Sequence, residues 1–223
     1  MPNSTIQKIE TPKRWRAQDT SGNNNHGQIY SGRGLEFDGV TDYLDGPLIG
    51  EAPYLSVAKN FTVACWLKID TATDSPVWAI TASGGADRVG LMVGAGGEVA
   101  FTSYTTSYDH VSAGAEGTKI TDIGTWYRIV CTMEPTSTKK LYINGVLQTY
   151  TGDGAFSSSL GPAGTRLKLG LGGTGTWNYL AGKMSDFQAW DATWTADDVA
   201  FDYANPEQLA LNRGGTSLTN SNL

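Results

Sequence analysis

Short runs of alternating apolar and polar residues recur along this 223-residue chain, separated by clusters of glycine, proline, asparagine and serine. Such spacing is typical of an all-β sandwich, in which short strands are joined by turns. The runs that predict strands are residues 34–39, 41–45, 61–69, 77–82, 88–94, 98–104, 126–133, 140–148, 166–172 and 181–190. We therefore expect strands along most of the chain.

The run 61–69 is apolar on both of its faces, which predicts a strand in the middle of a sheet. One face carries Phe61, Val63, Cys65 and Leu67. The other face carries Ala64 and Trp66 among more polar residues. A strand whose two faces are both apolar is expected to be covered on both sides.

Turn and cap residues predict a hairpin and a helix. Asn144-Gly145 lies between apolar residues, and this dipeptide favours a type I′ hairpin because both positions need positive φ. Near the end of the chain, Thr195 can cap a helix that Asn205-Pro206 would stop. We expect this short helix to fold over an edge of the sandwich.

Composition and charge limit the classes of partner. The chain has 28 glycines and 17% charged residues, as expected for one turn-rich β domain. Its net charge of −6 argues against nucleic acid as a partner. The first sixteen residues are nevertheless basic. We predict an N-terminal arm over residues 1–18 that docks on an acidic surface, or else a solvated terminus, followed by a sandwich over 19–205 and a tail over 206–223.

Neither a targeting segment nor a membrane span is evident. The first residues lack the apolar core of a signal peptide, and no run approaches the roughly 18 apolar residues of a transmembrane helix. We therefore expect a protein made in a cytoplasm, with no membrane partner. Cys65 and Cys131 each lie within an apolar strand, and we expect free, buried thiols; a disulfide across the sandwich is the alternative.

Residues with catalytic potential are few. The chain has two histidines and no nucleophile-elbow motif, so a catalytic triad is not predicted. Glu36 and Asp38 lie on one side of a single strand, but a third acid is missing from the arrangement that glucanases use. The simpler interpretation is that these acids are solvated, opposite a buried Leu35 and Phe37. We predict a protein that is not an enzyme, with a degenerate glycosidase as the alternative.

Several motifs in register resemble laminin-G-like domains of the concanavalin A-like lectin/glucanase superfamily, most closely their bacterial and phage branch. These are the segments 19–27 (DTSGNNNHG), 34–44, 61–69, 140–147 and 180–199, so the resemblance covers Asp19 to Asn205. It implies an all-β fold: a jelly-roll sandwich of two curved antiparallel sheets with one short C-terminal helix and no activity of its own.

Three segments depart from the pattern of that family. The usual tryptophan-bearing segment before the first loop is the basic KRWRAQ, residues 13–18. The usual pair of aspartates in the last strand is Ser185-Asp186, and a common histidine pair is Tyr127-Arg128. These departures bear on any charge or metal site in the family pattern.

The resemblance implies adhesion, since such domains bind glycans, bind proteins or decorate phage virions. Because no signal peptide is evident, we predict a non-enzymatic, lectin-like structural or adhesion protein of a phage virion, made in the host cytoplasm. Its predicted role is capsid decoration. Expected partners are the major capsid protein, other virion proteins, glycans and further copies of the chain. The alternative is a carbohydrate-binding module of a larger secreted or tail protein.

Aromatic residues in polar, turn-rich segments are candidate contacts to a glycan or a protein partner. Two segments contain them, TSYTTSYDHV at residues 102–111 and TGTWNYL at residues 174–180. The candidates are Tyr104, Tyr108, His110, Trp177 and Tyr179. The alternative is that these rings cover the edge of the sandwich.

The loop DTSGNNNHG, residues 19–27, is a candidate site for a structural calcium ion. Its side-chain and backbone oxygens are the hard ligands that calcium prefers. Asp19 would supply charge and Asn23 a further oxygen. By resemblance to the family, Asp186 of the last strand would complete the site, although Ser185 replaces one acid of the usual pair. The alternative is a loop held by Asx turns alone.

Overall fold

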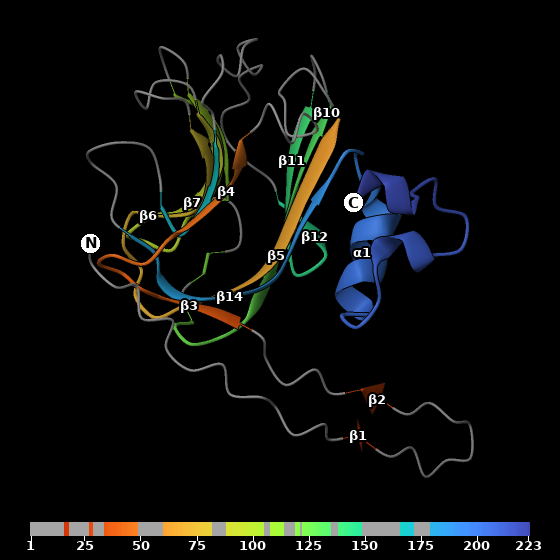
Figure 1. Ribbon diagram of the computed structural model, residues 1–223, viewed down its shortest axis with the longest axis horizontal. Coiled ribbons are helices and arrows are strands. Elements are labelled where there is room, and N and C mark those ends of the chain that lie inside the picture. Colours follow the sequence, from red (N-terminus) through yellow and green to blue (C-terminus); the bar gives the residue numbers. More distant parts are fainter. Residues whose placement is uncertain are drawn as a thin grey trace.

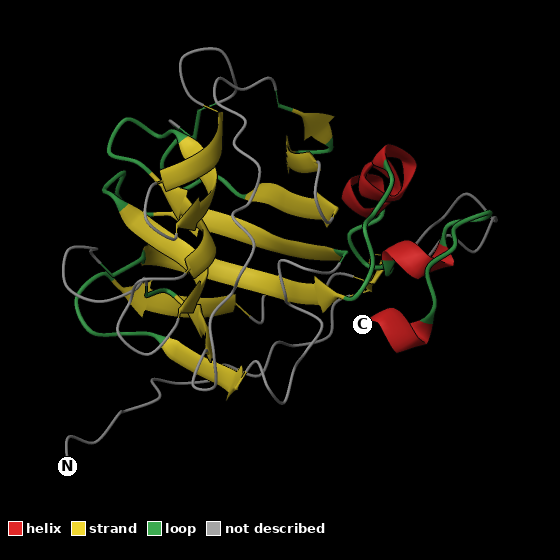
Figure 2. Ribbon diagram, turned by 90° about the horizontal axis from the view of Figure 1, so that it is seen from above, coloured by secondary structure: helices red, strands yellow, loops and turns green. Residues whose placement is uncertain are grey.

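Two antiparallel β-sheets face each other in the computed structural model, and the helical elements gather on one side of the pair (Figures 1 and 2). The structure describes residues 16–17, 27–28, 34–48, 60–81, 88–104, 108–113, 119–120, 122–134, 138–148, 166–171 and 179–223. The predicted all-β sandwich with one short C-terminal α-helix is confirmed.

Each sheet contains six strands, and every strand pair is antiparallel. The first sheet has the order β12 (Val146–Leu147), β11 (Thr138–Ile143), β10 (Tyr127–Glu134), β5 (Phe61–Ile69), β14 (Ala181–Trp190), β3 (Gly34–Asp38). The second has the order β4 (Leu44–Leu48), β13 (Arg166–Leu169), β6 (Ser75–Thr81), β7 (Arg88–Val93), β8 (Val99–Tyr104), β9 (Tyr108–Ala113).

A separate two-stranded ribbon pairs β1, Arg16–Ala17, with β2, Gly27–Gln28. The remainder of the predicted basic arm lies outside the described residues. The same is true of the predicted calcium loop apart from Gly27.

Local sequence signals located two elements correctly. β5 lies between β10 and β14 with most of its residues buried, as the apolar pattern on both faces predicts. Asn144 and Gly145 have φ of 51° and 78°, so they form the expected turn between β11 and β12. The segment predicted to be turn-rich around Tyr108 is different, because it forms β9 at an edge of the second sheet.

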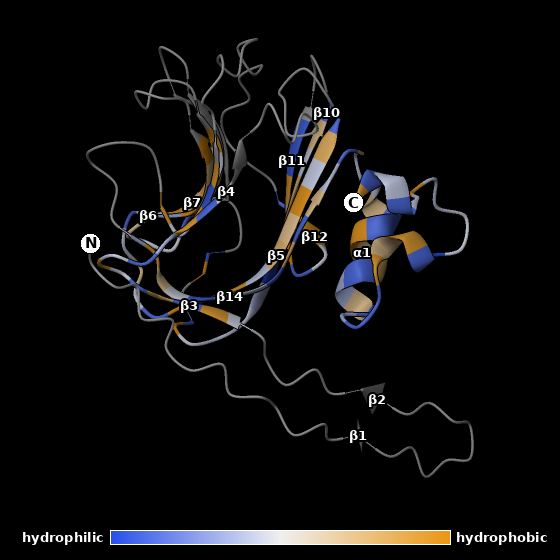
Figure 3. Ribbon diagram, in the orientation of Figure 1, coloured by the Kyte–Doolittle hydropathy of each residue, from blue (hydrophilic) through white to orange (hydrophobic). Residues whose placement is uncertain are grey.

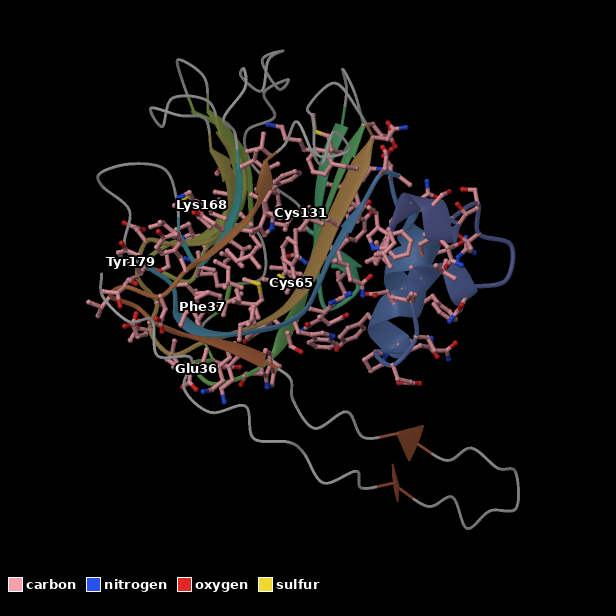
Figure 4. The ribbon with its side chains drawn as sticks, in the orientation of Figure 1. Glu36, Phe37, Cys65, Cys131, Lys168 and Tyr179 are labelled. Atoms are coloured by element: carbon pink, nitrogen blue, oxygen red, sulfur yellow. The ribbon has the colours of Figure 1, made fainter. Side chains whose placement is uncertain are left out.

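The main hydrophobic core fills the space between the two sheets, and strands β5 and β10 show largely hydrophobic colours in Figure 3. Cys65 and Cys131 are free thiols within this core, as predicted (Figure 4). Burial raises the pKa of Cys65 to about 12. Phe37 is buried as expected, whereas Leu35 is 41% exposed because β3 is the last strand of its sheet.

A second hydrophobic core lies on the outer face of the first sheet. Helix α1, Ala196–Ala204, and the residues after it pack there, so the helix covers a face and not the predicted edge (Figure 1). This core contains Ala64, Val130, Tyr142, Trp190, Trp194, Val199, Ala210 and Leu218. Two of its members come from the predicted tail over 206–223, whose short 3₁₀ helices are η1, Ala210–Asn212, and η2, Asn220–Asn222. The segment after α1 is therefore part of the fold.

A reciprocal cap begins helix α1. The Thr195 hydroxyl accepts a hydrogen bond from the Asp198 backbone N–H at 3.2 Å, and the Asp198 carboxylate accepts one from the Thr195 backbone N–H at 2.9 Å. Arg213 donates to the same carboxylate at 2.7 Å. Burial alone raises the pKa of Asp198, but the hydrogen bonds from Thr195 and Arg213 outweigh it, so this pKa lies below 3.8.

We predict that Asp198→Asn lowers the free energy of unfolding near neutral pH by about 2 kcal/mol, because a buried charged hydrogen-bond acceptor is lost. The lowered pKa means that the ionised carboxylate stabilises the fold above about pH 4 and that this contribution is lost as the pH falls through the folded-state pKa. The variant should therefore lose less stability on acidification. Urea unfolding across pH measures both effects.

Asp197 provides the control for this experiment, since it lies in the same turn with a side chain that is 83% exposed. Asp197→Asn should change the free energy of unfolding by less than about 0.5 kcal/mol. Equal losses in the two variants would contradict the role given to the cap.

Candidate functional site

The exposed Tyr43, the partly buried Tyr179 and an adjacent ion pair form the candidate binding site, here called the Tyr43 patch. Tyr43, which precedes β4, is 43% exposed. Its ring centroid lies 6.3 Å from that of Tyr179, with the two planes at 45°. Lys168 on β13 holds its Nζ atom 4.9 Å from the Tyr43 ring centroid and 3.2 Å from a carboxylate oxygen of Asp45 on β4.

Two neighbouring strands position these groups. Lys168 and Asp45 are register partners across β13 and β4, which brings their side chains together at the edge of the second sheet. Lys168 and Tyr179 lie on the side of the molecule away from α1 (Figure 4). The patch combines two aromatic rings with an ammonium donor and a carboxylate acceptor. Such a set can pack against the apolar face of a sugar ring and hydrogen-bond its hydroxyl groups.

The predicted contact residues that the structure describes lie at two different edges of the second sheet. Tyr104 and Tyr108 are register partners across β8 and β9, and His110 pairs with Thr102 in the same ladder. Tyr179 instead belongs to the patch beside β4, at the other edge of this sheet. With strands about 4.8 Å apart, these two edges lie about 24 Å from one another along the sheet. Trp177 lies outside the described residues.

The sequence pattern does not single out Tyr43, because it predicts a strand over residues 41–45. β4 begins at Leu44, which leaves Tyr43 in the connection between β3 and β4. The run TDYLD contains an aromatic residue between two aspartates, and this polar setting is the signal that could have marked it as exposed.

The two acids considered for glycosidase chemistry have structural partners. Glu36 pairs with Lys183 of the neighbouring strand at 2.6 Å. The Asp38 Oδ1 atom accepts hydrogen bonds from the backbone N–H groups of residues 40–42, at 2.8 to 2.9 Å. These hydrogen bonds hold the pKa of Asp38 well below its usual value. Asp38 therefore shapes the turn after β3 and is unsuited to act as a proton donor.

A buried arginine joins the first sheet to helix α1. Arg128 on β10 is 1% exposed and donates from Nε and Nη2 to the two carboxylate oxygens of Asp202, at 2.7 and 2.8 Å. Its Nη1 atom lies 3.0 Å from the Asp186 carboxylate and donates to the Asp186 carbonyl at 3.1 Å. Its guanidinium also lies 5.8 Å from the Trp66 ring centroid.

The charge of this arginine is secured by its partners. Burial works to lower the pKa of Arg128, but the hydrogen bond and charge of Asp202 and the charge of Asp186 outweigh burial and raise it. Burial raises the pKa of Asp202. The hydrogen bond and charge of Arg128 act in the opposite direction but do not cancel this effect. Because a buried charge is costly unless it is paired, these groups must stay together in the folded protein.

The fit of a calcium ion can be examined at Asp186, the one predicted ligand that the structure describes. Its Oδ2 atom contacts Arg128 and also accepts a hydrogen bond from the Gln188 amide at 2.8 Å. Among the described residues there is no group of three or more acidic, histidine or cysteine side chains arranged to hold a metal. The Asp186 carboxylate is therefore already paired with a cationic side chain. Asp19 and Asn23 lie outside the described residues.

The arrangement of two facing six-stranded antiparallel sheets defines a lectin-like β-sandwich. Residues 38–200 match the model of the concanavalin A-like lectin/glucanases superfamily, of the laminin-G-like type, and the chain belongs to this family. A search of curated proteins finds no sequence match. Within the part of the chain that the structure describes, no helix has the length and apolar content needed to span a membrane.

Solved structures of distant sequence share the fold. Domain 4 of the extracellular arabinanase AbnA from Geobacillus stearothermophilus, solved with arabinotriose, has a TM-score of 0.60 at 17% identity, covering 86% of this chain and 82% of that one. The heptameric SAP-like pentraxin of Limulus polyphemus has a TM-score of 0.52 at 17% identity, with coverages of 76% and 81%. Trypanosoma rangeli sialidase has a TM-score of 0.58 at 14% identity, with coverages of 78% and 28%.

We predict that Arg128→Met lowers the free energy of unfolding by about 3–5 kcal/mol, because it leaves the Asp202 carboxylate buried without its partner. The double variant Arg128→Met/Asp202→Leu should recover most of this loss, since apolar residues often replace a buried ion pair at little cost. Denaturant unfolding of both variants measures the difference.

Lys183→Met is the control, because it removes an ion pair to Glu36, whose side chain is 71% exposed. Its effect should stay below about 1 kcal/mol. A double variant as unstable as the single Arg128→Met would show that the loss does not come from an unpaired carboxylate.

Proposed function

We propose that this protein is a non-enzymatic adhesion domain that binds neutral glycans through the Tyr43 patch. The observation that carries the proposal is a tilted pair of tyrosine rings, the exposed Tyr43 and the partly buried Tyr179, bordered by a lysine–aspartate ion pair. Aromatic rings give contact area at a low cost in side-chain entropy, and the charged groups give direction to hydroxyl hydrogen bonds.

The charge of the patch favours neutral over acidic sugars. Asp45 compensates the ammonium group of Lys168, and the same ammonium faces the Tyr43 ring. The chain as a whole carries a net charge of −6, which repels sialylated or sulfated glycans at long range. An acidic sugar would therefore meet no uncompensated cation in this patch.

The comparisons are consistent with binding of this class. The arabinanase domain, which matches over most of both chains, was solved with a neutral oligosaccharide, arabinotriose. A sequence identity of 17% supports a shared fold but not a shared binding site. The position of a sugar on this chain is therefore inferred from the Tyr43 patch and not from that complex.

We also propose that this domain acts on the surface of a phage virion, as a decoration of the capsid. The support is the resemblance of segments such as 19–27, 34–44 and 180–199 to the phage branch of the family. Labelling of particles from the native source with an antibody against the chain tests it. Label on intact capsids is expected, and label confined to free protein would contradict it.

We predict that Tyr43→Ala and Tyr179→Ala each weaken binding of the best neutral oligosaccharide by tenfold or more, equivalent to about 1.4 kcal/mol. A glycan array identifies that ligand, and calorimetric titration measures the affinities. Tyr203→Ala is a matched control, because Tyr203 is 40% exposed but lies on α1, away from the patch. It should leave the affinity unchanged.

Two results would contradict the proposal. The first is that Tyr43→Ala and Tyr179→Ala both bind the glycan as tightly as the unmodified protein and have its melting temperature. The other is an array on which only acidic glycans bind, because this would require an uncompensated cation that the patch does not have.

A further inference from the structure

Four oxygen atoms from two aspartates surround the guanidinium group of Arg128. Two are the carboxylate oxygens of Asp202, at 2.7 and 2.8 Å from its nitrogens. The others are Oδ2 and the main-chain carbonyl of Asp186, at 3.0 and 3.1 Å. Asp186 has φ of +47° at an irregularity in the pairing of β14, where its carbonyl and carboxylate both reach the same guanidinium.

Carboxylate and carbonyl oxygens are the ligands that calcium prefers. Here they hold a cation that belongs to the chain. We propose that Arg128 takes, at Asp186, the place of a structural metal ion, so that the attachment of β14 to α1 depends on the guanidinium and not on calcium. The oxygen set is then a latent divalent-cation site that the arginine keeps filled.

Competition between the two cations favours the arginine. For calcium to bind Asp186, its Oδ2 atom would have to leave both Arg128 and the Gln188 amide. Arg128, which is 1% exposed, would then lose part of its compensation while remaining charged. A metal ion in solution must also lose water, whereas the guanidinium is held in place by β10.

Replacing the guanidinium with a neutral group removes the positive charge that Asp186 and Asp202 share. Arg128→Gln would leave the buried Asp202 carboxylate and the Asp186 carboxylate without a cation between them, and this like-charge repulsion destabilises the fold. The Asp186 side chain is 40% exposed, so water and a divalent ion can reach it. Calcium should then stabilise this variant by neutralising the pair. Arg128→Lys keeps a cation at the same place and should respond much less.

The first test compares melting temperatures in saturating calcium and in chelator for the unmodified protein, Asp186→Asn and the control Asp191→Asn, an exposed aspartate just after β14. Asp186→Asn should lower the melting temperature by the same amount in both conditions. Any calcium response of the unmodified protein, such as one from the 19–27 loop, should persist in this variant. A calcium response that Asp186→Asn abolishes and Asp191→Asn retains would overturn the proposal.

The second test measures the change in melting temperature on adding calcium or magnesium to Arg128→Gln and Arg128→Lys. We expect calcium to raise the melting temperature of Arg128→Gln by several degrees, and magnesium to raise it less. The melting temperature of Arg128→Lys should change little with either ion. A folded Arg128→Gln protein that does not respond to calcium would overturn the latent site. If this variant does not fold in chelator, refolding with added calcium is the measurement, and failure to refold counts against the proposal in the same way.

Discussion

A buried charge must be paired, and the partners of the buried Arg128 come from several separate elements of the fold. The guanidinium contacts Asp202 on α1, Asp186 on β14 and the ring of Trp66 on β5, while its own backbone belongs to β10. Its backbone N–H also donates to the side chain of Asn144 in the hairpin turn. Strands β5 and β14, the hairpin turn and helix α1 therefore all provide partners for this one residue.

The helical layer has a consequence for the placement of binding surfaces. Helix α1 and the segment after it cover much of the outer face of the first sheet, where Trp190, Trp194 and Val199 form a core of their own. The Tyr43 patch lies instead at the β4 edge of the second sheet. The helical layer thus covers one side of the sandwich, and the proposed binding patch lies on the side away from α1 (Figure 4).

Local signals explain which parts of this structure the sequence could predict. The two apolar faces of β5, the Asn144-Gly145 turn and the Thr195 cap each depend on a few neighbouring residues, and all three are found as predicted. The Arg128–Asp202 pair joins residues 74 positions apart, for which a single sequence has no local pattern. Strand β9 was missed because its edge position tolerates the polar residues that also mark loops.

The surroundings of the two thiols limit their reactivity. Cys65 and Cys131 lie in the core between the sheets, and burial raises the pKa of both, so the reactive thiolate is scarce in the folded protein. Alkylating reagents should reach them only when the sandwich opens. The rate of alkylation then measures how often the core opens. A cysteine introduced on the surface could carry a fluorophore without removal of the native pair.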